Sequence, residues 1–168
     1  MPAHFFGLEE PNPKKCAGKT QLSTTLCVKK MKYSGRCKCG NSKVSLEGVE
    51  SLGEISPRIC DCDYCNRHPS SMISEPSLDV KVVSCKGSFV TAKNGSDQAI
   101  FYHCNNCNQL VAVGAEIAGK LRGALNATLL KNHDQLGPPV SIQPRLLAPS
   151  EKLERWLKVW SRLSIGNA

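Results

Sequence analysis

The chain has 168 residues, which suits one domain, and only 5% of them are aromatic, so we expect a modest hydrophobic core. The formal charge is +8, but residues 1–36 hold seven basic and only two acidic side chains, so most of the excess lies there. No stretch approaches the roughly 18 consecutive apolar residues of a membrane span, and residues 1–10 do not resemble a signal peptide. We therefore expect a cytoplasmic protein with reduced thiols and no membrane partner, and a nuclear location is also open.

The position of the charge argues against a nucleic-acid partner. Residues 37–149 carry eleven basic and ten acidic groups, and metal-bound thiolates would make this part slightly acidic. Nucleic-acid-binding domains usually carry a basic face on the folded domain itself. We expect a basic arm attached to a folded domain, and the sequence does not predict the oligomeric state.

Residues 1–32 are expected to form a flexible basic arm. Prolines and scattered lysines interrupt any apolar periodicity there, apart from a weak strand signal near Gln21–Val28. Cys16 and Cys27 lie in this arm without ligand-like partners, so we interpret both as unligated thiols.

Residues 33–163 are expected to form a mainly β domain. Strand-like segments are Lys43–Glu47, Arg58–Cys60, Leu78–Ser84, Ser88–Lys93, Gln98–His103 and Val111–Val113. Asn94-Gly95 is a strong hairpin signal between two of them. Cys85 is expected to be a small buried thiol at the end of its strand. Residues 114–149 contain several glycine and proline breakers, and a partly helical Gly114–Leu130 is an alternative.

A C-terminal amphipathic helix is the clearest helical prediction. Ser150 is a suitable N-cap, and acidic residues occupy the first turn. Apolar residues then recur at steps of three and four: Leu153, Trp156, Leu157, Trp160 and Leu163. We expect the two tryptophans to cover an edge of the sheet and residues 164–168 to form a short tail.

Seven of the ten cysteines fall into three clusters, Cys37-Lys-Cys39, Cys60-Asp-Cys62-Asp-Tyr-Cys65 and Cys104-Asn-Asn-Cys107. In a reducing compartment such spacing is typical of zinc ligands. Four of the sulfurs complete a closed tetrahedral site, and three form a site with one open position, which is the usual layout of a catalytic zinc. The count predicts two zinc ions per chain and favours an enzyme. A disulfide framework is the alternative, but Cys-x-Cys pairs bridge poorly.

The order of these motifs resembles a known family. Tyr33-x-Gly35-x-Cys37-x-Cys39-Gly40, then the second cluster, then Phe101-x-x-Cys104-x-x-Cys107, resembles the glutathione-dependent formaldehyde-activating enzymes, a family that includes centromere protein V. The resemblance implies a coiled antiparallel β-tent sheet stapled by zinc. It implies that Cys37, Cys39, Cys104 and Cys107 hold a structural zinc and that Cys60, Cys62 and Cys65 hold a catalytic-type zinc.

Loop lengths support the same division. Metal binding by the first and last clusters closes a loop that spans most of the domain, which is where a metal contributes most to folding. Cys60–Cys65 closes only a short loop, so its metal is freer to take part in chemistry. Members of the family usually have glycine after the last cysteine pair, and this chain has Asn108 there.

The resemblance implies a zinc-dependent, carbon–sulfur lyase-like enzyme similar to S-hydroxymethylglutathione synthase. Its partner would be a small-molecule thiol such as glutathione, in an adduct with formaldehyde or another small aldehyde. Arg67 is a candidate partner for a glutathione carboxylate. The alternative is a non-catalytic zinc-stabilised binding module, with both sites closed because His68 supplies a fourth ligand. Pro69 restricts His68 towards extended geometry, so the open site is our hypothesis.

Overall fold

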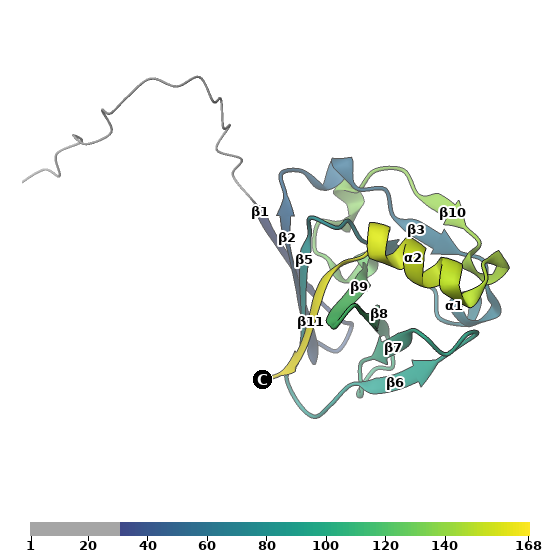
Figure 1. The fold of residues 1–168 in the computed structure, drawn as a ribbon. Coiled ribbons are helices and arrows are strands. Elements are labelled where there is room, and N and C mark those ends of the chain that lie inside the picture. Colours follow the sequence, from purple (N-terminus) through teal and green to yellow (C-terminus); the bar gives the residue numbers. More distant parts are fainter. Residues whose placement is uncertain (1–30) are drawn as a thin grey trace, which may run out of the picture.

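The computed structural model describes residues 31–168 (Figure 1). The predicted flexible arm, its weak strand signal near Gln21–Val28, and the thiols of Cys16 and Cys27 lie outside the described residues.

The described part of the chain is mainly β. Its strands are β1 (Met31–Arg36), β2 (Ser42–Val49), β3 (Arg58–Cys60), β4 (Met72–Ile73), β5 (Asp79–Ser84), β6 (Val90–Lys93), β7 (Ile100–His103), β8 (Leu110–Ile117), β9 (Lys120–Asn126), β10 (Val140–Ile142) and β11 (Ser161–Asn167). The α-helices are α1 (Asp63–Arg67) and α2 (Pro149–Val159), and short 3-10 turns occupy Leu52–Glu54, Ala127–Leu129, His133–Gln135 and Pro144–Leu146. The predicted mainly β fold with one substantial helix near the C-terminus is confirmed.

All eleven strands belong to one sheet, which follows the order β1-β2-β5-β11-β9-β4-β3-β10. The β7 strand pairs with β6 and β8, and β8 pairs with β9, so a second group of strands leaves this path at β9. Pairing is antiparallel except between β3 and β10 and between β5 and β11. The branch brings the β1–β2 and β7–β8 turns together, as a hydrogen bond between Asn41 and Asn105 shows. Figure 1 shows the arrangement of the strands.

Several predicted strands are confirmed. Arg58–Cys60 is β3, Lys43–Glu47 lies inside β2, and the Asn94-Gly95 signal marks the loop of the β6–β7 hairpin. The helical alternative for Gly114–Leu130 is wrong, because β8 and β9 pair there and only a 3-10 turn follows. Side-chain burial across this hairpin outweighs the helix propensity of its alanines and leucines.

The C-terminal helix differs from the prediction at both ends. Ala148 is the N-cap and Pro149 occupies the first turn, while Glu151 accepts a hydrogen bond from the Ala148 N–H at 2.7 Å. The helix ends at Val159, so Leu163 lies in β11 and not on the helix. Residues 164–167, expected to be a tail, form the end of β11 beside β5. Backbone hydrogen bonding to β5 and β9 thus makes residues 161–167 a strand, although apolar periodicity alone would extend the helix to Leu163.

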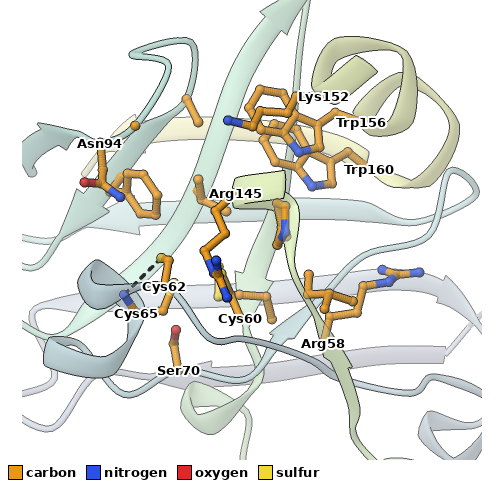
Figure 2. A pocket seen from close by; sticks show the side chains of 18 of the residues that line it. Arg58, Cys60, Cys62, Cys65, Ser70, Asn94, Arg145, Lys152, Trp156 and Trp160 are labelled. Atoms are coloured by element: carbon orange, nitrogen blue, oxygen red, sulfur yellow. Dashed lines mark hydrogen bonds between the residues drawn. The ribbon is translucent and has the colours of Figure 1, made fainter. Parts of the chain in front are cut away.

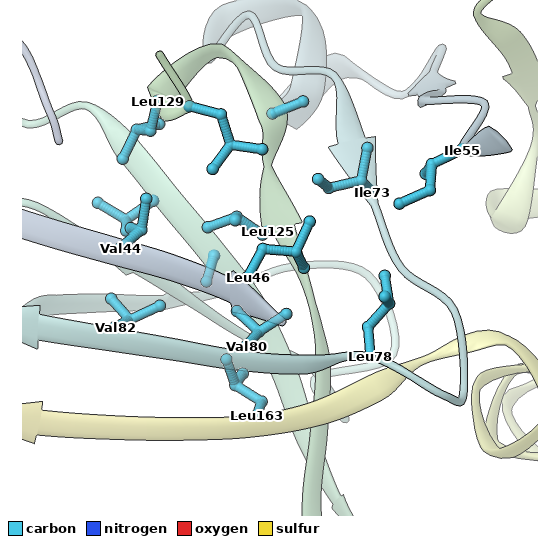
Figure 3. Close-up of a cluster of buried hydrophobic side chains, with 14 of the residues drawn as sticks. Val44, Leu46, Ile55, Ile73, Leu78, Val80, Val82, Leu125, Leu129 and Leu163 are labelled. Carbon is cyan, nitrogen blue, oxygen red and sulfur yellow. The ribbon is translucent and has the colours of Figure 1, made fainter. Parts of the chain in front are cut away.

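The main hydrophobic core is formed by buried side chains that pack together from β2, β4, β5, β9 and β11, among other segments (Figure 3). Alternate residues of β2 point into it, and Leu46 is fully buried, as is Leu125 from β9. Full burial of a leucine side chain stabilises the fold by about 1.5–3 kcal/mol. Gly123 allows β11 to pack closely, because a Cβ there would lie 2.5 Å from Leu163 Cδ2.

A second, smaller core forms between α2 and the β8–β9 hairpin. Trp156 and Trp160 are buried there and stack with ring centroids 4.3 Å apart and planes 6° apart. They pack with Val113 and Ala124 of the sheet. The tryptophans therefore cover the face of the β8–β9 hairpin and not an edge of the sheet as expected, since both strands are paired on either side. They also fix where α2 lies over the sheet.

Candidate metal centres

The first cluster joins two hairpin turns. Cys37 and Cys39 lie in the β1–β2 turn, and Cys104 and Cys107 lie in the β7–β8 turn. Their four sulfur atoms lie within 4.8 Å of one another. Asn41 strengthens the junction by donating to Asn105 Oδ1 at 2.6 Å. The fold thus brings together all four residues that the resemblance assigned to a structural metal.

The geometry of this cluster fits zinc. The Sγ atom of Cys37 lies 3.5 Å from that of Cys39 and 3.6 Å from that of Cys104. A tetrahedron with Zn–S bonds of about 2.3 Å has edges of about 3.8 Å, so only small shifts are needed. The backbone N–H of Ser42 donates to Cys37 Sγ at 3.2 Å, as suits a metal-bound thiolate. All the cysteines of the described residues are free thiols.

The second cluster is local. Cys60 ends β3, Cys62 is the N-cap of α1, and Cys65 lies within α1. Their sulfur atoms again lie within 4.8 Å of one another. The N-cap geometry positions two of the sulfurs, because the N–H of Cys65 donates to Cys62 Sγ at 3.5 Å. This donor set fits a zinc ion with three protein ligands.

An ion pair fixes the loop that carries these three sulfurs. The carboxylate of Asp61 accepts from Arg145 Nε at 3.2 Å and Nη2 at 3.1 Å, and from Gln143 Nε2 at 2.8 Å. The Arg145 side chain is the main reason that the pKa of Asp61 is lowered. Gln143 and Arg145, in the segment after β10, thereby hold Asp61 and the loop between Cys60 and Cys62 in place.

The three thiols share protons unequally. The thiol of Cys65 donates to Cys60, which lowers the pKa of Cys60 to about 6 despite its partial burial. The same hydrogen bond, together with burial, raises the pKa of Cys65. The hydrogen bond thus favours the thiolate form of Cys60 over that of Cys65, and the thiolate is the form that binds a metal.

His68 is not part of this ligand group. Its ring instead packs against Tyr64 and His103, with centroids 4.7 Å away in both cases. Burial, followed by the neighbouring His103 and Arg67, lowers the pKa of His68. The closed Cys₃His arrangement therefore does not form in this structure.

A buried hydrogen-bond chain that sequence reasoning missed links the two clusters. Tyr64 Oη lies 2.6 Å from His103 Nε2, and His103 Nδ1 lies 3.1 Å from the carbonyl oxygen of Asn108. A carbonyl only accepts, so His103 Nδ1 carries the proton and the Tyr64 hydroxyl donates to Nε2. Tyr64 stands between Cys62 and Cys65, and its position inside a ligand motif was the available signal.

A pocket opens beside the second cluster (Figure 2). Its volume is about 230 Å³, and Cys60, Cys62 and Cys65 all line it. Lys152 and Trp156 of α2, and Trp160 at its C-cap, lie across it from these cysteines. No sequence motif indicated this contribution, because α2 reaches the pocket only through tertiary packing.

The basic residues around the pocket have different partners. Arg58 pairs with Glu75 at 3.3 Å, and Arg145 is held by Asp61. Lys152 has no ion-pair partner among residues 31–168 and lines the pocket. Arg67, the candidate named from sequence, is exposed and does not line the pocket. Lys152 is therefore the better-placed cation for an anionic substrate group.

A buried hydroxyl lies in the same wall. Ser70 lines the pocket together with the three cysteines, and its Oγ is buried without a hydrogen-bond partner in the described part of the chain (Figure 2). A buried unpaired hydroxyl costs about 1–3 kcal/mol. A neighbouring thiolate sulfur would be a suitable acceptor for it.

The fold and the two cysteine groups define a β protein whose thiol sets can hold metal ions and fit zinc. The chain belongs to the glutathione-dependent formaldehyde-activating enzyme family, whose match covers residues 32–144. A solved structure of a Rhodobacter sphaeroides protein is 21% identical, with a TM-score of 0.46 over 64% of this chain and 99% of that one. A comparison with curated proteins gives no match. Among residues 31–168, no helix has both the length and the apolar character needed to cross a bilayer.

Proposed function

We propose that this protein binds two zinc ions and acts as a carbon–sulfur lyase-like enzyme at Cys60, Cys62 and Cys65. Its substrate would be the adduct of a small thiol, glutathione or a related compound, with formaldehyde or another small aldehyde. The observation that carries this proposal is that all three sulfurs of the second cluster line a pocket, while His68 turns away from them. Family membership supports the same chemistry.

The reaction is balanced without any oxidant or reductant. A thiol sulfur bonds to the carbonyl carbon, the π electron pair moves to oxygen, and the thiol proton ends on that oxygen to give a hydroxymethyl thioether. The reverse reaction breaks the carbon–sulfur bond. A zinc ion held by the three cysteines would supply a Lewis acid that keeps the substrate thiol deprotonated near neutral pH.

The chain's own residues would position the substrate. Lys152, unpaired at the pocket, is placed to bind a carboxylate of the thiol. The Asp61–Arg145 pair holds the cysteine loop in place, which limits the entropy lost when the substrate binds. The Tyr64–His103 hydrogen bond anchors α1 from its buried side.

The test is the exchange rate between formaldehyde and its glutathione adduct, measured by NMR exchange spectroscopy with zinc-loaded protein. The reaction proceeds without a catalyst, so the protein-free rate is the baseline. We expect the wild type to accelerate exchange and Cys62→Ser to return it to the baseline, while metal analysis falls from about two zinc equivalents to one. Cys85→Ser, at a half-buried thiol outside both clusters, is the matched control.

Equal exchange with and without zinc-loaded wild type would exclude turnover and favour the non-catalytic binding module. Zinc loss in His68→Ala would support the same outcome, because it would make His68 a ligand.

A further inference from the structure

The pocket is larger than a one-carbon aldehyde requires. It measures about 230 Å³, whereas an apolar cavity of about 150 Å³ accommodates a benzene ring. A molecule the size of formaldehyde, comparable to one or two waters of roughly 30 Å³ each, would leave most of the space unfilled. The volume therefore calls for a second, bulkier group.

The interior of the pocket is apolar. Its apolar walls come from β4, β7, β8, β9, α2 and the C-cap of α2, through Met72, Phe101, Val113, Ala124, Trp156 and Trp160. The stacked tryptophans face the cysteine side across this space (Figure 2). A desolvated hydrocarbon group would gain free energy here in proportion to its buried area.

The thiol itself does not supply such a group if it is glutathione-like. Its carboxylates and ammonium would lose hydration in the interior without finding partners, because Arg58 and Arg145 are already engaged by Glu75 and Asp61. These charges are better placed beside Lys152, which lines the pocket and has no ion-pair partner among residues 31–168. The apolar interior is then left for the aldehyde.

We infer that the pocket binds the hydrocarbon substituent of an apolar aldehyde, a short alkyl chain or a single aromatic ring, next to the sulfur cluster. This rests on the proposed function and names its substrate class: thiol adducts of apolar aldehydes, in addition to that of formaldehyde. The chemistry is unchanged. The thiol sulfur adds to the carbonyl carbon, the thiol proton ends on oxygen, and a secondary hydroxyl replaces the hydroxymethyl group.

Binding can be tested without any reaction. The chain has two tryptophans and both line the pocket, so intrinsic fluorescence reports its occupancy directly. Alkan-1-ols from propanol to hexanol, and benzyl alcohol, carry the same substituents without an electrophilic carbonyl. We expect saturable emission changes, with Kd falling about fourfold per added methylene until the pocket is full.

Pocket-filling variants provide the contrast. Ala99→Leu and Ile142→Phe each add volume at a lining position, so the alcohol series should stop tightening at a shorter chain. Both filling variants are made so that the test still holds if one of them fails to fold. The control is Leu157→Ala. Leu157 lies on α2, the helix that carries Trp156, but it is 45% exposed and does not line the pocket, so this variant should behave like the wild type. No saturable change in the wild type, or identical series in all variants, would overturn the inference.

Activity then separates this inference from the proposed function. Zinc-loaded wild type should exchange thiol adducts of hexanal or benzaldehyde with a kcat/KM at least tenfold above that for formaldehyde, and Ala99→Leu should reduce that ratio. Alcohol binding without any exchange activity would leave the pocket assignment standing and remove the lyase proposal. Formaldehyde exchange without alcohol binding would do the reverse.

Discussion

Removing one sulfur should destabilise the fold strongly at the first cysteine cluster and only slightly at the second. Cys104→Ser disrupts a site whose ligands Cys37 and Cys104 are 67 residues apart, whereas Cys60 and Cys65, the ends of the second cluster, are only 5 apart. Loop closure costs about 0.6 kcal/mol per doubling of length, so the first site constrains the unfolded chain by about 2 kcal/mol more. Structural zinc contributes on the order of 10 kcal/mol of coupled binding and folding, comparable to the whole stability of a domain, about 5–15 kcal/mol.

We therefore expect Cys104→Ser to be unfolded or insoluble. Cys62→Ser should remain folded with one zinc fewer, because serine is a good N-cap and can still accept from the Cys65 N–H. Thermal unfolding followed by tryptophan fluorescence, with metal analysis of the same samples, measures both effects. A Tm within about 5 °C of the wild type is expected for Cys62→Ser. If it is as destabilised as Cys104→Ser, the second site is structural and the catalytic proposal loses its support.

Three further substitutions test the surroundings of the second cluster. Tyr64→Phe leaves buried His103 Nε2 without its donor, so urea unfolding should show a loss of about 1–3 kcal/mol. Asp61→Asn removes the negative charge and one of the two acceptor oxygens that hold Arg145, so zinc release to a chelator should be faster. The pKa of Asp61 is lowered in the fold, so its contribution is complete above the pKa of the unfolded chain and is lost as the pH falls through the lower folded pKa. The release rates of the two proteins should therefore converge in acid. Ser70→Ala should weaken zinc retention if its buried hydroxyl donates to a thiolate, and unchanged retention would assign that hydroxyl no role at the metal.

The two groups of cysteines were predictable, because the tight spacing of each motif and the family resemblance together indicate which thiols can meet. Cys37 and Cys104 come together in the structure as the resemblance implied, in a group that could hold a metal ion. Alternating apolar residues in the sequence also identified β2 and β5 correctly, since a strand with one buried face has a period of two and the burial of both strands alternates. The strand periodicity and the tight cysteine motifs are encoded locally, whereas the meeting of Cys37 and Cys104, 67 residues apart, was expected only through the resemblance.

The C-terminal region could not be predicted in the same way. Leu163 follows Trp160 at a helical step of three, but Ser161 and Leu163 are also buried at the alternating step of a strand. Which period prevails depends on the free edges of β5 and β9, which are far away in sequence. The pocket lining from α2 has the same origin, because Trp156 reaches it only after β11 has fixed the end of the helix.

The Tyr64–His103–Asn108 chain gives the two metal clusters a physical connection. His103 directly precedes Cys104, and Asn108, whose φ is +55°, directly follows Cys107. Holding these two cysteines in place therefore also orients His103, whose Nε2 accepts the hydrogen bond of the Tyr64 hydroxyl. Tyr64 in turn lies in α1 between two ligands of the second cluster. A metal held at the first site would thus support the fold and also position the helix that presents the second set of sulfurs. Loss of the first metal should therefore disorder the second site, whereas loss of the second should leave the first intact.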